Sequence, residues 1–193
     1  PTGERGRWRR RALYPAAGLA VVCVVIGATW GLIDSFGPAP LGRDLELSKT
    51  VADRNSKLLR SYVTSQGRWR LPATREQVDP RYLDVLFAYE DKRFFQHSGV
   101  DPLAFGRAAL QFVSNGEIVS GGSTITMQVA RLLEPRAKRS LYVKLREAVR
   151  AIQLESNLSK DEILGLYLTL APYGGNLEGI RAASLSYFGK EPK

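Results

Sequence analysis

The sequence predicts a mainly α-helical domain with a small β element at its start, preceded by a transmembrane helix. Three patterns lead to this fold class: residues 12–33 carry no charge, residues 51–72 hold short apolar stretches between turn residues, and helical spacing of apolar residues begins at residue 79. With 193 residues, 44% of them hydrophobic, the chain can bury one core. We therefore expect a basic tail at 1–11, a transmembrane helix at 12–33, a linker at 34–50 and one domain at 51–193.

The uncharged run at 12–33 is long enough to cross a bilayer. As a helix, at ~1.5 Å per residue, it would span about 33 Å. Five arginines and one glutamate lie in residues 1–11 and account for +4 of the net charge of +9. The positive-inside rule then places the N-terminus in the cytoplasm and everything after Asp34 outside. A cleaved signal peptide is the alternative, but its apolar part is usually only about 7–15 residues long, so a retained anchor is favoured.

The β element and the first helix follow from turn and cap residues. Turns at 53–56 and 65–67 divide the segment 51–72 into short strands. Asp79 followed by Pro80 is typical of a helix cap with proline at the first helical position. This signal predicts a helix that ends near Glu90, with Glu90 close to its apolar face.

Start and stop signals predict the remaining helices, at about 101–113, 123–134, 140–156, 160–170 and 178–188. The residues from Ser159 to Glu162 form a capping box, and Gly189 would end the last helix. For the helix at 140–156 we expect a buried stripe formed by Leu141, Leu145, Ala148 and Ile152.

Composition excludes some classes of function. The single cysteine, Cys23, allows no disulfide within the chain, and the single histidine, His97, allows no Cys/His metal cluster. The basic charge outside the tail suits an anionic partner such as a lipid headgroup or a pyrophosphate. Nucleic acid is not expected, because the basic groups would lie outside the cell and no aromatic stacking platform accompanies them.

The densest group of reactive side chains is the segment EDKRFFQHSGVD, residues 90–101. It combines the adjacent carboxylates Glu90 and Asp91 with two phenylalanines and His97. A carboxylate enclosed by apolar groups has a raised pKa, which suits a general acid or base. For this segment alone, a solvated helix end with His97 capping a turn is an equally open interpretation.

The second segment is GGSTITMQVAR, residues 121–131. Glycines before a Ser/Thr helix start leave backbone N–H groups free, which forms a natural anion site. An ordinary glycine loop with a serine cap is the simpler interpretation of this segment alone. A nucleotide P-loop is excluded because no G-K-[ST] follows the glycines.

The third segment is basic, with Glu134 as its one acid. Its six cations are Arg131, Arg136, Lys138, Arg139, Lys144 and Arg146. Such a run is usually a solvated surface. Lys144 and Glu147, however, share a helix face, where a lysine and a carboxylate together could stabilise a pyrophosphate leaving group and orient the reactants. With Glu90, this set fits displacement of a pyrophosphate from a sugar, and equally glycoside hydrolysis by paired carboxylates.

In this order and spacing, the segments resemble the glycosyltransferase domain of class A penicillin-binding proteins, glycosyltransferase family 51. The family's first motif, E-D-x-x-F-x-x-H-x-G, is matched by Glu90, Asp91, Phe94, His97 and Gly99. The second, G-G-S-T-[IL]-T-Q-Q, is matched by Gly121, Gly122, Ser123, Thr124, Thr126 and Gln128. The third, R-K-x-x-E, is matched by Lys144 and Glu147. The fourth, K-x-x-I-L-x-x-Y-L-N, is matched by Lys160, Ile163, Leu164, Tyr167 and Leu168.

The resemblance implies a lysozyme-like α fold and lipid II as substrate, a disaccharide-pentapeptide on undecaprenyl pyrophosphate. Glu90 would be the catalytic base that deprotonates the acceptor 4-hydroxyl, and inversion at the donor anomeric carbon would give a β-1,4 bond. Glu147 would be the second catalytic carboxylate, and Lys144 with Arg131 would bind the pyrophosphate. The other expected substrate-binding residues are Asp91, Phe94, His97, Gly121, Ser123, Thr124 and Gln128.

The resemblance also implies a location and partners. The chain would be a single-pass protein of the bacterial inner membrane with its domain on the periplasmic or extracellular side. Its partners would be lipid II, the growing glycan strand, the membrane and a cell-wall synthesis complex. We expect a divalent cation, Mg²⁺ or Mn²⁺, at the pyrophosphate, assign it no ligand, and expect no organic cofactor. A lysozyme-like lytic glycosidase and a non-catalytic lipid II-binding or membrane-binding protein are the alternatives.

The sequence departs from the family pattern at a few positions. Val143 stands where the third motif has arginine, and we hypothesise that Arg139 or Arg146 replaces its charge. Met127 and Thr169 replace a glutamine and an asparagine of the second and fourth motifs. The family's fifth motif and the S-x-x-K signature of a transpeptidase do not occur in residues 1–193, so we expect the domain at 51–193 to be C-terminally truncated.

Overall fold

The structure is a computed structural model that describes residues 27, 31, 33–104, 106–107, 122–135 and 140–193. The chain divides into two compact units, residues 1–38 and 39–193. The predicted basic tail and nearly all of the predicted transmembrane segment at 12–33 lie outside the described residues. Among the residues that are described, none of the helices has the length and apolar character needed to cross a membrane.

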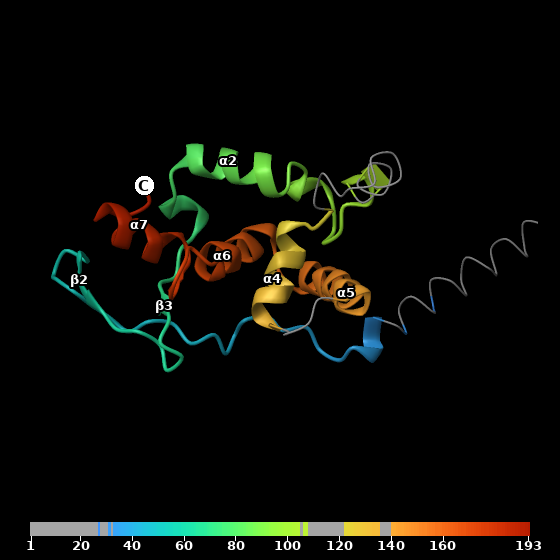
Figure 1. Cartoon of the computed structure of the whole chain (residues 1–193), viewed down its shortest axis with the longest axis horizontal. Coiled ribbons are helices and arrows are strands. Elements are labelled where there is room, and N and C mark those ends of the chain that lie inside the picture. Colours follow the sequence, from blue (N-terminus) through green and yellow to red (C-terminus); the bar gives the residue numbers. More distant parts are fainter. Residues whose placement is uncertain (1–26, 28–30, 32, 105, 108–121, 136–139) are drawn as a thin grey trace, which may run out of the picture. The chain divides into compact units, whose positions relative to one another are not determined.

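The second unit is mainly α-helical with a small β element, as predicted (Figure 1). Its elements in chain order are β1 (Thr50–Ala52), β2 (Leu58–Ser61), β3 (Trp69–Arg70), η1 (Arg75–Gln77), α2 (Pro80–Glu90), η2 (Phe94–Gln96), α4 (Ile125–Leu133), α5 (Leu141–Asn157), α6 (Lys160–Leu170), β4 (Leu177–Glu178) and α7 (Ile180–Phe188). Residues 102–104 and 106–107 are helical at the predicted start after Asp101, and the rest of that predicted helix lies outside the described residues.

Side-chain caps explain why four of these helices begin where they do. Asp79 accepts a hydrogen bond from the Arg81 N–H, and Pro80 follows it as predicted. Thr124 caps α4, Ser140 caps α5, and Ser159 caps α6 within the predicted capping box. Each cap satisfies a backbone N–H that has no partner inside its helix, so these starts are set locally.

The core is formed where α4 packs against both α5 and α6 (Figure 1). Its fully buried apolar side chains include Ile125, Val129, Leu154, Ile163, Leu164 and Leu168. Each large apolar side chain buried here contributes roughly 1.5–3 kcal/mol, so this interface stabilises the domain. The central position of α4 matters for function, because α4 carries the second of the sequence segments described above.

The predicted buried stripe of α5 is wrong. Leu145 is 51% exposed, and Ala148 and Ile152 are only partly buried. The side chain of Leu141 is not among those that the structure describes. The buried face of α5 consists instead of Val149, Arg150, Ala151, Gln153 and Leu154. The stripe was predicted from apolar residues alone. A cation can also be buried when it forms an ion pair with a carboxylate, as Arg150 does with Glu134.

The β element consists of two separate two-stranded sheets among the described residues. β1 and β2 pair antiparallel, as the predicted turn suggests, whereas β3 and β4 pair in parallel. Glu178 therefore lies in a strand and not in the last helix, which begins at Ile180. Strands of two residues show no periodicity in a sequence. The pairing depends on distant contacts, such as the 2.6 Å ion pair between Arg70 Nε and Glu178 Oε2.

The later part of the predicted linker, residues 39–50, belongs to the second unit. Leu41 lies against the core, and the Ser48 N–H donates to the Arg70 carbonyl at 2.8 Å. This segment is therefore held along the domain by specific contacts.

Gly179 gives a test of how tightly β4 is joined to α6. Its φ is +83°, and an added Cβ would lie 2.6 Å from the Thr169 carbonyl oxygen. Gly67 is the matched control, because its φ is +73° but an added Cβ would meet nothing within 4 Å. Gly67→Ala should cost about 1–2 kcal/mol for the left-handed conformation alone, and Gly179→Ala a further ~1–3 kcal/mol for the clash. Urea denaturation measures both, and equal losses would contradict the close approach.

Candidate active site

Glu90 lies at the C-terminus of α2 and faces a cleft of about 480 Å³. The Glu90 side chain is exposed, and its Oε2 accepts a hydrogen bond of 2.7 Å from Gln128 Nε2 on α4. The cleft is lined by Tyr82, Leu86, Glu90, Gln128, Arg131, Leu132, Tyr167, Ala171, Pro172 and Tyr173. Two of the expected substrate-binding residues, Gln128 and Arg131, thus lie beside the expected base.

The expected enclosure of Glu90 by apolar rings is not found. Phe87, Phe94 and Phe95 pack on one another, with ring centroids 5.0–5.7 Å apart, and Phe94 is only 1% exposed. Glu90 itself is solvent-accessible at the cleft. Of the two phenylalanines in the segment 90–101, Phe94 therefore belongs to the core and Phe95 is 49% exposed, and neither lines the cleft at Glu90.

Asp91 differs from its neighbour because its carboxylate is buried and fully engaged. It is 7% exposed and accepts from His97 Nε2 at 3.0–3.1 Å and from the Ile125 N–H at 3.0 Å. Because a carboxylate accepts hydrogen bonds, His97 Nε2 is the donor in this contact. Asp91 sits at the N-terminus of α4, where the helix dipole favours a negative charge. The first backbone N–H of α4 is thus taken by a carboxylate of the chain itself, while the anion site predicted at Gly121 and Gly122 stays a prediction.

Further contacts hold the segment 90–101 on the helices behind it. Thr124, and not Ser123, caps α4, and its Oγ1 also donates to the Gly99 carbonyl at 2.5 Å. Gly99 has φ +92°, and a Cβ there would lie 2.6 Å from the backbone of Ala151 on α5. The segment is therefore fixed on α4 at one contact and on α5 at the next.

The basic segment is organised around Glu134. Its carboxylate accepts from Arg146 Nη2 at 3.0 Å and from Arg150 Nη2 at 2.8 Å. Burial alone would raise the pKa of Glu134, but the hydrogen bonds and charges of Arg150 and Arg146 outweigh it and lower the pKa. Arg146, one hypothesised substitute for the missing arginine at Val143, is thus engaged with a carboxylate of the chain. The other, Arg139, lies outside the described residues.

The structure does not bring every predicted residue to the cleft. Lys144 is exposed and Glu147 partly buried, both on α5, and neither lines the cleft at Glu90. The side chains of Phe94, His97 and Thr124 are buried and do not line the cleft. Ser123, the residue before the Thr124 cap, is partly buried. Gly121 lies outside the described residues.

Three tyrosines line the cleft, of which the motifs contain Tyr167 but not Tyr82 or Tyr173. The hydroxyls of Tyr82 on α2 and Tyr173 after α6 are in hydrogen-bond contact. Burial raises the pKa of Tyr82, Tyr173 and Tyr167, so all three stay neutral near pH 7. The helical spacing gave no clear signal for Tyr82, because eight residues separate it from Glu90 and place it about 80° around the helix from that residue.

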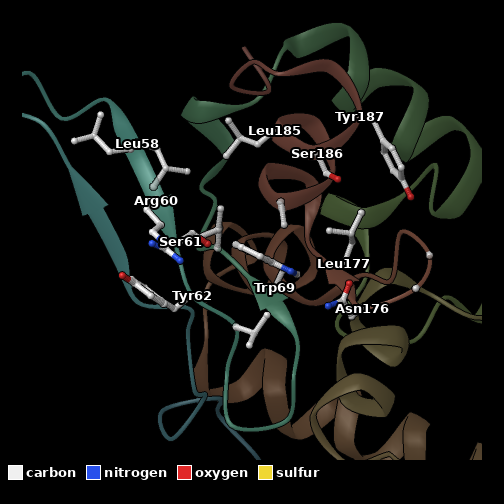
Figure 2. A pocket seen from close by; sticks show the side chains of 16 residues that line it. Leu58, Arg60, Ser61, Tyr62, Trp69, Asn176, Leu177, Leu185, Ser186 and Tyr187 are labelled. Atoms are coloured by element: carbon white, nitrogen blue, oxygen red, sulfur yellow. The ribbon is translucent and has the colours of Figure 1, made fainter.

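A larger hollow of about 960 Å³ lies on the other side of the loop at 172–177. Figure 2 shows Trp69 in its middle, with Arg60 and Tyr62 of the β2 region on one side and Leu185 and Tyr187 of α7 on the other. This hollow shares no lining residue with the cleft at Glu90. It is therefore a separate feature from the candidate active site.

Comparison with known proteins assigns the family. A family model described as Transglycosylase matches residues 55–193. The chain belongs to the transglycosylase family. It is 48% identical to penicillin-binding protein 1C of Escherichia coli K12 over 189 residues, which is 98% of this chain and 23% of that protein. The stretches at 67–72 and 126–135 resemble the 1C type in particular.

Two further transglycosylase relatives are more distant. Penicillin-binding protein 1A of Escherichia coli K12 is 36% identical over 181 residues, 89% of this chain and 21% of that protein. Penicillin-binding protein 1F of Bacillus subtilis 168 is 36% identical over 149 residues, 77% of this chain and 20% of that protein. The chain thus spans less than a quarter of the length of these curated relatives.

The chain's own side chains give no fit for the expected divalent cation in the part of the structure that is described. No group of three or more His, Cys, Asp or Glu residues there could hold a metal ion. Glu90 and Asp91 are adjacent, but Asp91 is committed to His97 and Ile125. The cation stays a prediction.

The lowered pKa of Glu134 predicts how stability depends on pH. The folded chain favours the ionised form of Glu134. Its contribution to the free energy of unfolding is therefore complete above the pKa of the unfolded chain, near 4.5, and is lost as the pH falls through the lower pKa of the folded chain. Glu134→Gln should lower the unfolding free energy at pH 7 by about 1.5–3 kcal/mol, and should weaken the loss of stability on acidification. Urea denaturation at pH 7 and below 4.5 measures this, with Asp84→Asn on the exposed face of α2 as control. An unchanged free energy of unfolding at pH 7 would contradict the stabilising role of the Glu134 contacts with Arg146 and Arg150.

Proposed function

We propose that this chain is a peptidoglycan glycosyltransferase, which polymerises lipid II into β-1,4 glycan strands and releases undecaprenyl pyrophosphate. The observation that carries the proposal is the exposed carboxylate of Glu90, oriented by Gln128 in a cleft that also holds Arg131, in a chain of the transglycosylase family. A lysozyme-like arrangement of the helices is part of the proposal.

In the proposed reaction, Glu90 takes the proton from the acceptor 4-hydroxyl. That oxygen attacks the anomeric carbon of the lipid-linked donor, and the bond from this carbon to the pyrophosphate oxygen breaks, with its electron pair leaving on the pyrophosphate. Attack from the opposite face inverts the configuration and gives the β-1,4 bond. The Gln128 amide occupies Glu90 Oε2 at 2.7 Å and so holds the carboxylate in one orientation while lone pairs stay available.

The leaving pyrophosphate needs positive charge. Arg131 is exposed at the cleft, one helical turn after Gln128 on α4, and a cation fixed there would stabilise the charge that develops on the leaving group. We assign Lys144 to the pyrophosphate as a second cation and Glu147 to the second carboxylate role, reached by a donor that extends from the cleft to α5. A divalent cation, if the reaction uses one, would be held chiefly by the pyrophosphate oxygens.

The geometry is less suited to a lytic glycosidase. Such enzymes place two carboxyl groups about 5–9.5 Å apart across the scissile bond. Among the described residues that line the cleft, Glu90 is the only one with a carboxylate. A transferase needs one base at the acceptor and positive charge at the donor, which is the set that Glu90 and Arg131 provide.

We also propose that the uncharged run at 12–33 anchors the chain in the bacterial inner membrane, N-terminus inside and domain on the periplasmic or extracellular side. An anchor would keep the domain beside a substrate that is itself held in the bilayer. The expected partners are lipid II, the growing glycan strand and a cell-wall synthesis complex.

Glu90→Gln tests the proposed function. Removing the base should lower the polymerisation of fluorescent lipid II in detergent by about 10²–10⁴-fold, while lipid II binding persists because Gln keeps the size of the side chain. Gel analysis of the glycan products measures the activity, and Asp84→Asn on the same helix should leave it unchanged. If the parent chain binds lipid II but forms no polymer, or if Glu90→Gln is as active as the parent, the proposed function is wrong and a non-catalytic binder replaces it.

A further inference from the structure

A buried ionic cluster lies behind the cleft, where α4, α5 and α6 meet. Lys160 Nζ, at the start of α6, contacts Glu155 Oε1 of α5 at 2.6 Å. Thr126 Oγ1 of α4 donates to the same oxygen at 2.7 Å. The side chains of Lys160 and Glu155 are 20% and 8% exposed, so the pair lies largely away from water. None of the three lines the cleft at Glu90.

The cluster also contacts the segment that follows the proposed base. Lys160 Nζ lies over the ring of Phe94, 4.4 Å from its centroid, in the geometry of a cation–π interaction. Phe94 meets His97 edge to face with centroids 6.5 Å apart, and His97 donates to Asp91, the residue next to Glu90. A continuous set of contacts therefore joins Lys160 to the proposed base.

The cluster restricts geometry more than it adds stability. Desolvation of a buried ion pair largely offsets the attraction between its members. The ammonium group must nevertheless stay within reach of one carboxylate oxygen and over one ring face, while the Thr126 hydroxyl donates to that same oxygen. These requirements hold Phe94 at one place relative to α4, the helix that carries Gln128 and Arg131.

We propose that Lys160 is a positioning residue for the glycosyltransferase site. Through Glu155 and the ring of Phe94, it sets the place of His97 and Asp91, and thereby the place of Glu90 relative to Gln128. The inference rests on the proposed function for its kinetic consequence but not for its structural one. A misplacement of about 1 Å can reduce the rate of a chemical step by about 100-fold, so Lys160 affects turnover without touching substrate.

The experiment compares Lys160→Met, Lys160→Arg and the double variant Lys160→Met/Glu155→Gln with the parent chain. The double variant removes both charges together, so no carboxylate is left buried beside an apolar side chain. Lys57→Met, at an exposed position between β1 and β2, is the control. The readouts are the unfolding midpoint, kcat and KM for lipid II, and the NMR signals of the His97 imidazole, which are unambiguous because the chain has one histidine.

We expect the double variant to stay folded, to shift the His97 signals and to lose 10–100-fold in kcat, with KM changed by no more than about twofold, in line with a step limited by positioning. Lys160→Arg should recover most of kcat, because it keeps the charge and the cation–π contact. A folded double variant with parental His97 signals and parental kcat would overturn the proposal. If the parent chain makes no glycan, the proposed function fails, and the His97 signals alone then decide on the positioning role.

Discussion

The carboxylate of Asp91 is the contact on which the site depends. Asp91 is the residue that follows the last residue of α2. Its carboxylate accepts hydrogen bonds both from the first N–H of α4 and from the imidazole of His97. Two helices that are separated in sequence by more than thirty residues are thereby joined at their ends. Glu90 is the residue before Asp91, and Gln128 lies one turn inside α4. The contact between Asp91 and the start of α4 therefore brings the proposed base, Glu90, next to the Gln128 amide at the same cleft.

Polar groups buried on α5 hold the helices that support this junction. Arg150 and Glu134 join α5 to the end of α4, and Glu155 joins α5 to Thr126 on α4 and to Lys160 on α6. Apolar packing between helices tolerates small shifts, whereas an ion pair with further hydrogen bonds has one good geometry. The apolar core therefore supplies most of the stability, and these pairs restrict how α4, α5 and α6 sit against one another.

Local signals in the sequence predicted the helices well, because the cap of a helix lies beside it in the chain. Asp79 with Pro80, and Ser159 with Glu162, each satisfy their own helix start. Sequence patterns failed where the partner is distant, as with Arg150 and Glu134 on α5 and α4, or Arg70 and Glu178 in the paired strands. The motifs predicted Glu90, Gln128 and Arg131 as parts of one site, and all three line the same cleft. The motifs did not show that Asp91 accepts from the first N–H of α4, nor that Tyr82 and Tyr173 line the cleft.

Glu90 and Asp91 show how adjacent carboxylates acquire different tasks. Asp91 is buried and its oxygens already accept from His97 and Ile125, so it has little capacity left for a substrate. Glu90 accepts a hydrogen bond from Gln128 and is open to the cleft. A base must accept a proton from its substrate, which requires an accessible lone pair. The engagement of Asp91 is thus what leaves Glu90 as the carboxylate of this pair that can do chemistry, and it is also what holds Glu90 in place.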